Sequence, residues 1–232
     1  MALLNTNESE HSSLTDRAYG ELEERIVTLQ LEPGAVLSEA TLAKQLGFGR
    51  TPIREALQRL AREGLVVIFP RRGILVSEID VKRQLMLLEV RRELERLMAA
   101  KATQRASDAE QQHFLAIAQG MEQASVDNDD ITFMRLDREL NLLVASAARN
   151  EFASRAMGLM HGLSRRFWYF HYKEVADLPL CAKLHADLAR AIYQGDPEKV
   201  VAASDRLMDY IEDFTRASLD AMSSTRAGVP FR

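Results

Sequence analysis

Five arginines fall on two short stretches of the chain, and their chemistry suits the binding of nucleic acid. A guanidinium group can donate two hydrogen bonds to O6 and N7 of guanine, and it also neutralises phosphate. For any single arginine a solvated surface position is the alternative, but five on one predicted helix and one predicted loop favour binding. They are Arg50, Arg54, Arg62, Arg71 and Arg72.

The net charge of the chain conceals an uneven distribution. The 232 residues carry 30 Lys and Arg against 34 Asp and Glu, and this formal charge of −4 by itself argues against phosphate binding. Residues 40–76, however, hold seven basic and two acidic side chains, which gives this segment +5 and leaves −9 for the remainder. The asymmetry predicts a basic module joined to an acidic one.

Composition also excludes several classes of protein. Cys181 is the sole cysteine, so the chain can form neither an intramolecular disulfide nor a cysteine zinc cluster. No run approaches the roughly 18 apolar residues that a membrane span needs, and residues 1–13 lack the apolar core of a signal peptide. We therefore expect a cytoplasmic protein with no membrane partner.

The first third of the chain has the element order of a winged helix-turn-helix. Apolar residues at helical spacing predict three helices, and two runs rich in β-branched residues predict a hairpin. Ser38 is the expected N-cap of the second helix; Thr51 is that of the third, with Pro52 at the first helical position. The predicted helices cover residues 14–29, 39–46 and 52–63, and the predicted strands cover 65–69 and 74–77 around a loop at 70–73.

Several linked motifs stand in this segment: IVTLQLEPG at 26–34, LAKQLG at 42–47, RTPIREALQRL at 50–60 and EGLV at 63–66. They resemble those of the GntR family of bacterial transcription factors, and the resemblance covers about residues 14–79. It implies a DNA-binding domain whose partner is a double-stranded operator.

The resemblance implies that the third helix contacts DNA. The contacts of the family's recognition helix match Arg50, Thr51, Pro52 and Arg54 of this chain, with Arg50 and Arg54 as readers of bases or phosphates. The family usually has Ser before the Arg-Thr-Pro motif, whereas this chain has Gly49. We therefore do not include, among the expected DNA contacts, a phosphate contact from a serine hydroxyl at position 49.

The predicted hairpin supplies a second group of contacts. Gly73 matches the wing-tip residue of the family that enters the minor groove. Arg71 and Arg72 precede it at the tip of the loop, where a wing would bring them against the duplex.

The remaining two thirds of the chain predict an antiparallel all-α bundle, so the fold class is mainly α. Pro and Gly become sparse and long helical periods take over. The predicted helices cover about 81–105, 108 onward, 130–148, 150–172, 177–194 and 197–223. The expected organisation is a flexible tail at 1–13, the winged domain at 14–79, an effector-binding and dimerisation domain at 80–224 and a tail at 225–232.

The bundle carries weaker motifs: EVR at 89–91 followed by Glu95, LD at 136–137, LH at 184–185 and GD at 195–196. They resemble the FCD ligand-binding domain of the FadR-type branch of the GntR family, over about residues 82–222. The resemblance implies a homodimer that responds to a small-molecule effector.

In many such domains an Asp and three His hold a divalent metal such as zinc. Asp137 and His185 match two of these ligands, Asn141 stands at the position of the first His, and the last position falls on Leu207 or Tyr210. Asp137 and Asn141 share one helical face, and an Asn carbonyl oxygen can be a ligand. One alternative that the resemblance implies is therefore a metal site at Asp137, Asn141 and His185.

The alternative is a pocket in which these three side chains, together with Arg91, bind the effector directly. Arg91 matches a family position that often points into the pocket and would suit a carboxylate. It could instead form a surface ion pair with Glu95, one helical turn away. His161 is a further candidate for the pocket or the metal, although a lone helical His is more often structural or exposed.

We therefore expect a homodimeric regulator, a repressor rather than an activator, that an organic acid releases from a palindromic operator. A constitutive DNA-binding dimer without effector is one alternative. A metal-dependent helical-bundle enzyme is another, but the chain has no Gly-x-Ser-x-Gly, phosphate-binding or dinucleotide-binding motif, and only Glu110–His113 offers a Glu-x-x-His pair within the bundle. The prediction is that the protein is not an enzyme.

Overall fold

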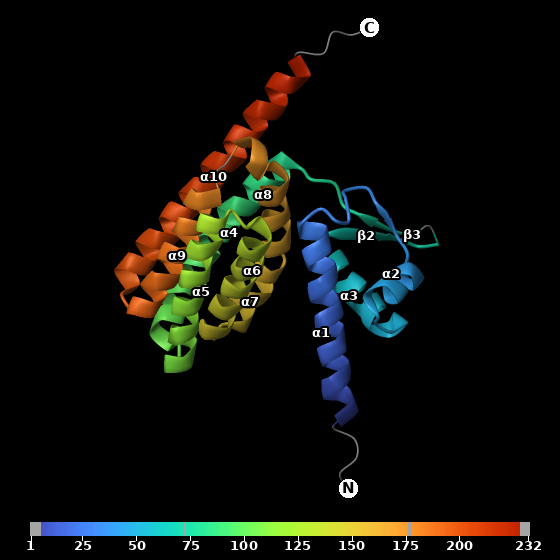
Figure 1. The fold of residues 1–232 in the computed structure, drawn as a ribbon, viewed down its shortest axis with the longest axis horizontal. Coiled ribbons are helices and arrows are strands. Elements are labelled where there is room, and N and C mark those ends of the chain that lie inside the picture. The colour runs from blue at the N-terminus through green and yellow to red at the C-terminus, as the bar shows by residue number, and fades with distance from the viewer. Residues whose placement is uncertain (1–5, 72, 176–177, 228–232) are drawn as a thin grey trace. The chain divides into compact units, whose positions relative to one another are not determined.

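The chain forms two compact units, which we describe separately (Figure 1). Unit 1 comprises Met1–Ile79 and Gly162–Tyr169, and unit 2 comprises Asp80–His161 and Phe170–Arg232. The computed structural model describes residues 6–71, 73–175 and 178–227, and the side chains of 14–71, 73–173 and 178–221. Helices dominate both units, which confirms the predicted mainly α fold class.

Unit 1 contains three helices of its own and a small antiparallel sheet. The sheet has the strand order β1-β3-β2, with Val36 opposite Leu75 and Val66 opposite Val76. The hairpin was predicted, but β1 lies in what the sequence indicated as a connector, because a strand of two residues has no readable alternation. The elements are α1 (Thr6–Val27), β1 (Val36–Leu37), α2 (Glu39–Leu46), α3 (Arg50–Arg62), β2 (Val66–Phe69) and β3 (Gly73–Val76).

One apolar core holds these elements together. Leu22 and Ile26 of α1 pack with Ile53 and Leu57 of α3, and all four side chains are fully buried. α1 begins at Thr6, so residues 6–13 continue a helix where the sequence predicted a flexible tail. The prediction started this helix at residue 14 because apolar residues at helical spacing begin there, and residues 6–13 are polar.

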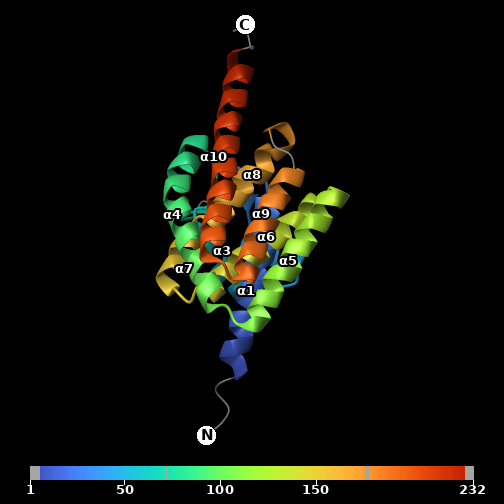
Figure 2. The ribbon, with the colours of Figure 1, turned by 90° about the vertical axis from the view of Figure 1, so that its left-hand side faces the viewer.

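Unit 2 is a bundle of helices. α10 packs against α4 and α9, and α5 packs against α9 and α6 (Figure 2). Asp80 is the N-cap of α4 and accepts hydrogen bonds from the backbone N–H groups of Lys82 and Arg83. The helices are α4 (Val81–Arg105), α5 (Asp108–Asp127), α6 (Asp130–Ala147), α7 (Glu151–Gly158), α9 (Leu178–Gln194), α10 (Pro197–Ala227) and part of α8 (His161–Val175).

The single helix predicted at 150–172 is in fact two helices, α7 and α8. The backbone N–H of Leu159 turns back to the carbonyls of Ala156 and Met157, which ends α7. Gly158 and Gly162 flank the break and have low helix propensity, whereas the apolar spacing on which the prediction relied continues across it. At the C-terminus, α10 includes residues 225–227, which the sequence assigned to a tail.

Within the described part of the chain, no helix is both long enough and apolar enough to cross a membrane.

Candidate nucleic-acid interface and ligand pocket

α2 and α3 form the helix-turn-helix of unit 1. The side chain of Ser38 accepts a hydrogen bond from the backbone N–H of Thr41 (3.4 Å), which confirms it as the N-cap of α2. Gly47 ends α2 in the left-handed conformation (φ 71°), which glycine adopts without a steric penalty. Only Phe48 and Gly49 then separate this position from the start of α3.

α3 starts earlier than the sequence predicted. Its N-cap is Gly49, in an extended conformation (φ −66°, ψ 163°), rather than Thr51, and no side chain caps the helix. Pro52 is therefore the third helical residue, where it is still tolerated because the N–H groups of the first turn have no partner within the helix. Arg50 and Thr51 are exposed, whereas Pro52 is buried. An uncapped N-terminus of this kind is favourable for an anion.

Arg54 projects from α3 toward α2. Its guanidinium forms hydrogen bonds with both carboxylate oxygens of Glu39, from Nε (3.2 and 3.3 Å) and Nη2 (3.1 Å), and its side chain is 56% exposed. The hydrogen bonds and charge of Glu39 raise the pKa of Arg54. The guanidinium is thus already oriented, and a phosphate or base would compete with Glu39 for it. Arg62, near the end of α3, is exposed.

The β2–β3 hairpin places the predicted wing residues at its tip. Phe69 and Gly73 are opposed in the last pair of the ladder. Arg71 is exposed and has a positive φ (64°), and Gly73 has a φ of 108°, which side chains rarely allow. Arg72 lies outside the described residues.

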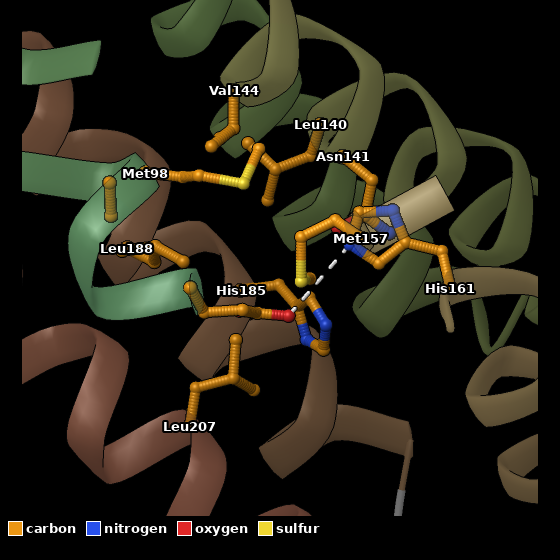
Figure 3. A pocket seen from close by; sticks show the side chains of 11 residues that line it. Met98, Leu140, Asn141, Val144, Met157, His161, His185, Leu188 and Leu207 are labelled. Atoms are coloured by element: carbon orange, nitrogen blue, oxygen red, sulfur yellow. Dashed lines mark ion pairs between the residues drawn. The ribbon is translucent and has the colours of Figure 1, made fainter. Parts of the chain in front are cut away.

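A second group of predicted residues surrounds a cavity of about 20 Å³ in unit 2, which has room for about one water molecule (Figure 3). Apolar side chains form most of its wall, and four residues with polar side chains complete it. The lining residues are Glu95, Met98, Ala99, Leu140, Asn141, Val144, Met157, His161, His185, Leu188 and Leu207.

Asp137 and His185 form a buried pair beside this cavity. Nε2 of His185 lies 3.3 Å from Oδ1 of Asp137, and Nδ1 donates to the carbonyl of Cys181 (2.8 Å). The same Oδ1 accepts a hydrogen bond from Nδ2 of Asn141 (3.2 Å). Burial lowers the pKa of His185, but Cys181 and Asp137 outweigh it, so the pKa lies well above the usual value. Because both ring nitrogens face acceptors, the ring is an imidazolium.

This donor set does not fit a resident metal ion. Within the described residues, no three His, Cys, Asp or Glu side chains lie close enough together to hold one. Asn141 replaces one expected His, and Leu207, at one of the two candidate positions for the last His, presents an apolar side chain to the cavity. The structure brings Asp137, Asn141 and His185 together, but as a hydrogen-bonded cluster.

Arg91 is engaged elsewhere. Its Nε donates to Oε1 of Glu95 at 2.5 Å, both side chains are buried, and Arg91 is absent from the cavity lining. Glu95 lines the cavity in its place, and its Oε1 lies 4.0 Å from Nε2 of His161 (dashed in Figure 3). The i, i+4 spacing of Arg91 and Glu95 was the sequence signal for this pair, but it did not show that the pair is buried at a pocket.

Two family models match the chain, and they follow its two predicted domains in order. Residues 14–76 match "Bacterial regulatory proteins, gntR family", and residues 86–210, more than half of the chain, match the FCD domain. The chain belongs to the GntR family. It combines the family's N-terminal helix-turn-helix with an FCD domain, as the sequence motifs predicted.

Curated relatives of this GntR-family protein are transcriptional regulators. A regulator from Streptomyces ambofaciens is 51% identical over 65 residues, which is 28% of each chain. McbR of Escherichia coli K12 is 30% identical over 60% of this chain and 63% of its own length. The repressor RspR of the same organism is 23% identical over 88% and 89%. The chain thus spans less than two thirds of the first two relatives.

Solved structures show the same fold. The structure of E. coli McbR/YncC covers 88% of this chain and 97% of its own, with 20% identity and a TM-score of 0.74. A GntR regulator from Rhodococcus covers 90% and 99%, with 24% identity and a TM-score of 0.63. At these identities the likeness shows the fold alone. The curated relatives McbR and RspR are named as transcriptional regulators, in agreement with the prediction that the chain is not an enzyme.

Proposed function

We propose that this GntR-family protein is a DNA-binding transcriptional regulator that responds to a small ligand. The observation that carries the proposal is the first turn of α3, the second helix of the helix-turn-helix. It is uncapped by any side chain and displays exposed Arg50 and Arg54. Arg71 and Gly73 at the hairpin tip add a second contact region in the same unit, and Arg72 belongs to the proposed set by its sequence position. These groups suit both phosphates and guanine edges.

A homodimer would read a palindromic operator, one half-site per subunit, because the symmetry of the protein matches that of the DNA. Supporting this, α4 and α7 pack against each other through Met98 and Met157, and both expose apolar side chains. Exposed apolar side chains that share one face of a helix suit a contact with a second subunit. The exposed residues are Met86, Val90 and Leu97 on α4 and Phe152 and Leu159 on α7.

The proposed effector is an organic acid that binds in the cavity of unit 2 without a metal. Asn141 and His161 bring N–H groups to the cavity, and these suit a carboxylate. His185 also lines the cavity, but its ring nitrogens already face Asp137 and the Cys181 carbonyl. Arg91 is bound to Glu95, which lines the cavity, and an acid would compete with Glu95 for it. Because the cavity holds only about one water molecule, the ligand must displace flexible side chains such as Met157. Release from DNA on binding would make the protein a repressor, the role given in the name of its relative RspR.

DNA binding is tested by selecting duplexes from a random library and titrating the selected sequence. We expect a palindromic site whose affinity falls steeply with salt, because phosphate contacts release counterions. Arg50→Ala should weaken binding roughly tenfold, whereas Arg155→Ala, which removes one exposed charge from unit 2, should not. Equal binding by wild type and Arg50→Ala would contradict the assignment of α3.

Ligand binding is tested by thermal unfolding with a panel of small carboxylates and the matching uncharged amides. A ligand at 100 times its Kd adds about 2.7 kcal/mol to the free energy of unfolding. The shift should disappear in Asn141→Leu and persist in Gln112→Leu, a matched change at an exposed position of α5. If zinc but no carboxylate stabilises the protein, the cavity is a metal site. If nothing does, the bundle is a constitutive dimerisation domain.

A further inference from the structure

Helix α1 lies beside α3 in unit 1 (Figure 1). The hydroxyl of Thr15 donates a hydrogen bond to Glu55 of α3 (2.6 Å), and the hydroxyl of Tyr19, one turn later on α1, donates to Glu63 at the C-cap of α3 (2.8 Å). Because the contacts follow the same order in both helices, the two helices run in the same direction. The first half of α1 therefore lies at the same end of unit 1 as the first turn of α3.

Arg17 reaches from this part of α1 to the turn between α2 and α3. Its side chain is exposed, and Cζ of its guanidinium lies 5.8 Å from the centre of the Phe48 ring. Phe48 directly precedes Gly49, the N-cap of α3, and packs against the apolar core of unit 1. The ring is thus a fixed platform that holds the cation close to the start of α3.

The charge of Arg17 is available in a way that those of two neighbouring arginines are not. Arg54 binds Glu39 and Arg59 binds Asp16, so a carboxylate already offsets each of these charges. Within the described residues, by contrast, Arg17 forms no ion pair. A phenyl ring attracts a cation but carries no net charge to neutralise it. The charge and the N–H donors of Arg17 therefore remain available to an anion.

The anion that best fits this position is a backbone phosphate of double-stranded DNA. A small acid would need an enclosed pocket, whereas this guanidinium is exposed at the surface. In a helix-turn-helix the second helix enters the major groove, so the elements around its start face the sugar–phosphate strand beside that groove. Arg17 lies outside α3 but near its start, which suits a contact with that strand rather than with a base edge.

We propose that Arg17, held against Phe48, contacts a backbone phosphate of the operator and so adds α1 to the DNA interface. The contact fixes the position of unit 1 on the duplex and adds affinity, without reading sequence. Arg17 lies outside the basic segment 40–76, the recognition helix and the wing, so neither charge distribution nor motifs indicated it. The inference rests on the proposed function, because it requires that unit 1 binds DNA.

The test is a titration of full-length protein with the duplex selected from the random library. Each phosphate contact contributes about −0.9 to the slope of log K against log salt concentration. Arg17→Ala should therefore weaken binding, and the ratio of its Kd to that of the wild type should fall about 3.5-fold between about 50 and 200 mM salt. The loss should be the same on duplexes with one base pair changed, because a phosphate contact is uniform across sequences.

Arg25→Ala is the matched control. Arg25 lies in the last turn of the same helix, and its loss changes the net charge by the same amount. This variant should bind as the wild type does at both salt concentrations. Arg17→Lys keeps the charge and should retain most of the salt dependence. Because Ala is favoured in an exposed helical position, Arg17→Ala should fold, which far-UV circular dichroism checks.

The role of the ring is tested with a double-mutant cycle. Phe48→Leu keeps an apolar side chain against the core but removes the platform, so Arg17→Ala should weaken binding less in this background than in the wild type. The proposal is overturned if the two losses are fully additive, if Arg17→Ala binds like the wild type, or if Arg25→Ala loses as much. If the wild-type protein itself selects no duplex, the proposed function fails as well, and this result differs from all three.

Discussion

The Asp137–His185 pair leads to a prediction about the stability of unit 2 as the pH changes. The two side chains are 6% and 7% exposed, and both ring nitrogens of His185 face acceptors. Asp137→Asn keeps the shape of the side chain and removes its charge. In this variant we expect a neutral His185, with Nδ1 still donating to the Cys181 carbonyl and Nε2 accepting from the new amide.

The numbers of protons bound by the folded and unfolded protein determine how the free energy of unfolding changes with pH. In the wild type the pKa of His185 in the folded protein lies above its value in the unfolded chain, about 6.5. Protonated His185 therefore stabilises the folded protein fully below pH 6.5, and this contribution is lost as the pH rises through the folded-state pKa. The folded variant binds fewer protons than the folded wild type wherever the wild-type His185 is charged. The difference in free energy of unfolding between the two proteins should therefore shrink as the pH rises from 6 to 8, by at most about 1.36 kcal/mol per pH unit.

Urea unfolding followed by far-UV circular dichroism at pH 6, 7 and 8 measures this difference. Asp129→Asn is the matched control, because Asp129 is the exposed N-cap of α6 and Asn caps equally well. Its difference from the wild type should not vary with pH in this range. A constant difference for Asp137→Asn as well would refute the reasoning, since it would mean that His185 is neutral in the wild type and that its Nε2 is available to a ligand or metal.

Two further predictions concern local structure. Gly158→Ala should raise the thermal midpoint slightly, because a Cβ there meets nothing within 4 Å and Ala is favoured over Gly by up to about 1 kcal/mol in a helix. Gly162→Ala should lower the midpoint despite the same gain in helix propensity, because its Cβ would meet Leu65. A higher midpoint in both variants would contradict the close approach of Gly162 and Leu65. Hydrogen bonds from Arg149 and from the backbone of Ser107 lower the pKa of Glu110 to about 2, so its contribution is present above pH 4.5 and is lost as the pH falls toward 2. The midpoint of Glu110→Gln should lie below that of the wild type at pH 7 and approach it near pH 2.5, and an equal gap at both pH values would argue against this network.

Much of the DNA-binding unit could be predicted from local sequence. The N-cap Ser38 and the predicted bounds of α2 at 39–46 are confirmed, because capping and left-handed positions such as Gly47 depend on only a few neighbouring residues. The start of α3 was wrong by two residues, since Thr51 and Gly49 can both begin a helix and the fold uses the extended backbone of Gly49. Strand β1 was missed because its two residues become a strand only by pairing with β3.

The ligand pocket was predicted less completely. The i, i+4 spacing put Asp137 and Asn141 on one face, the family resemblance grouped His185 with them, and the structure places all three side chains in one cluster. Whether Arg91 faces a ligand or Glu95 could not be read from spacing, because both arrangements use the same helical geometry. Burial decides it, since a buried guanidinium needs an anion beside it and Glu95 is one turn away.

The sequence by itself determined the family, the two-part organisation and the basic character of residues 40–76, because motifs, helical periods and charge are properties of neighbouring residues. Only the tertiary structure decided that α8 is shared between the two units, that His185 is paired with Asp137 and that Glu95 and His161 line the cavity. The physical reason is the same in each case. These outcomes depend on which side chains from distant parts of the chain share a buried, low-dielectric environment, and a buried charge takes the partner that packing brings to it rather than the partner nearest in sequence.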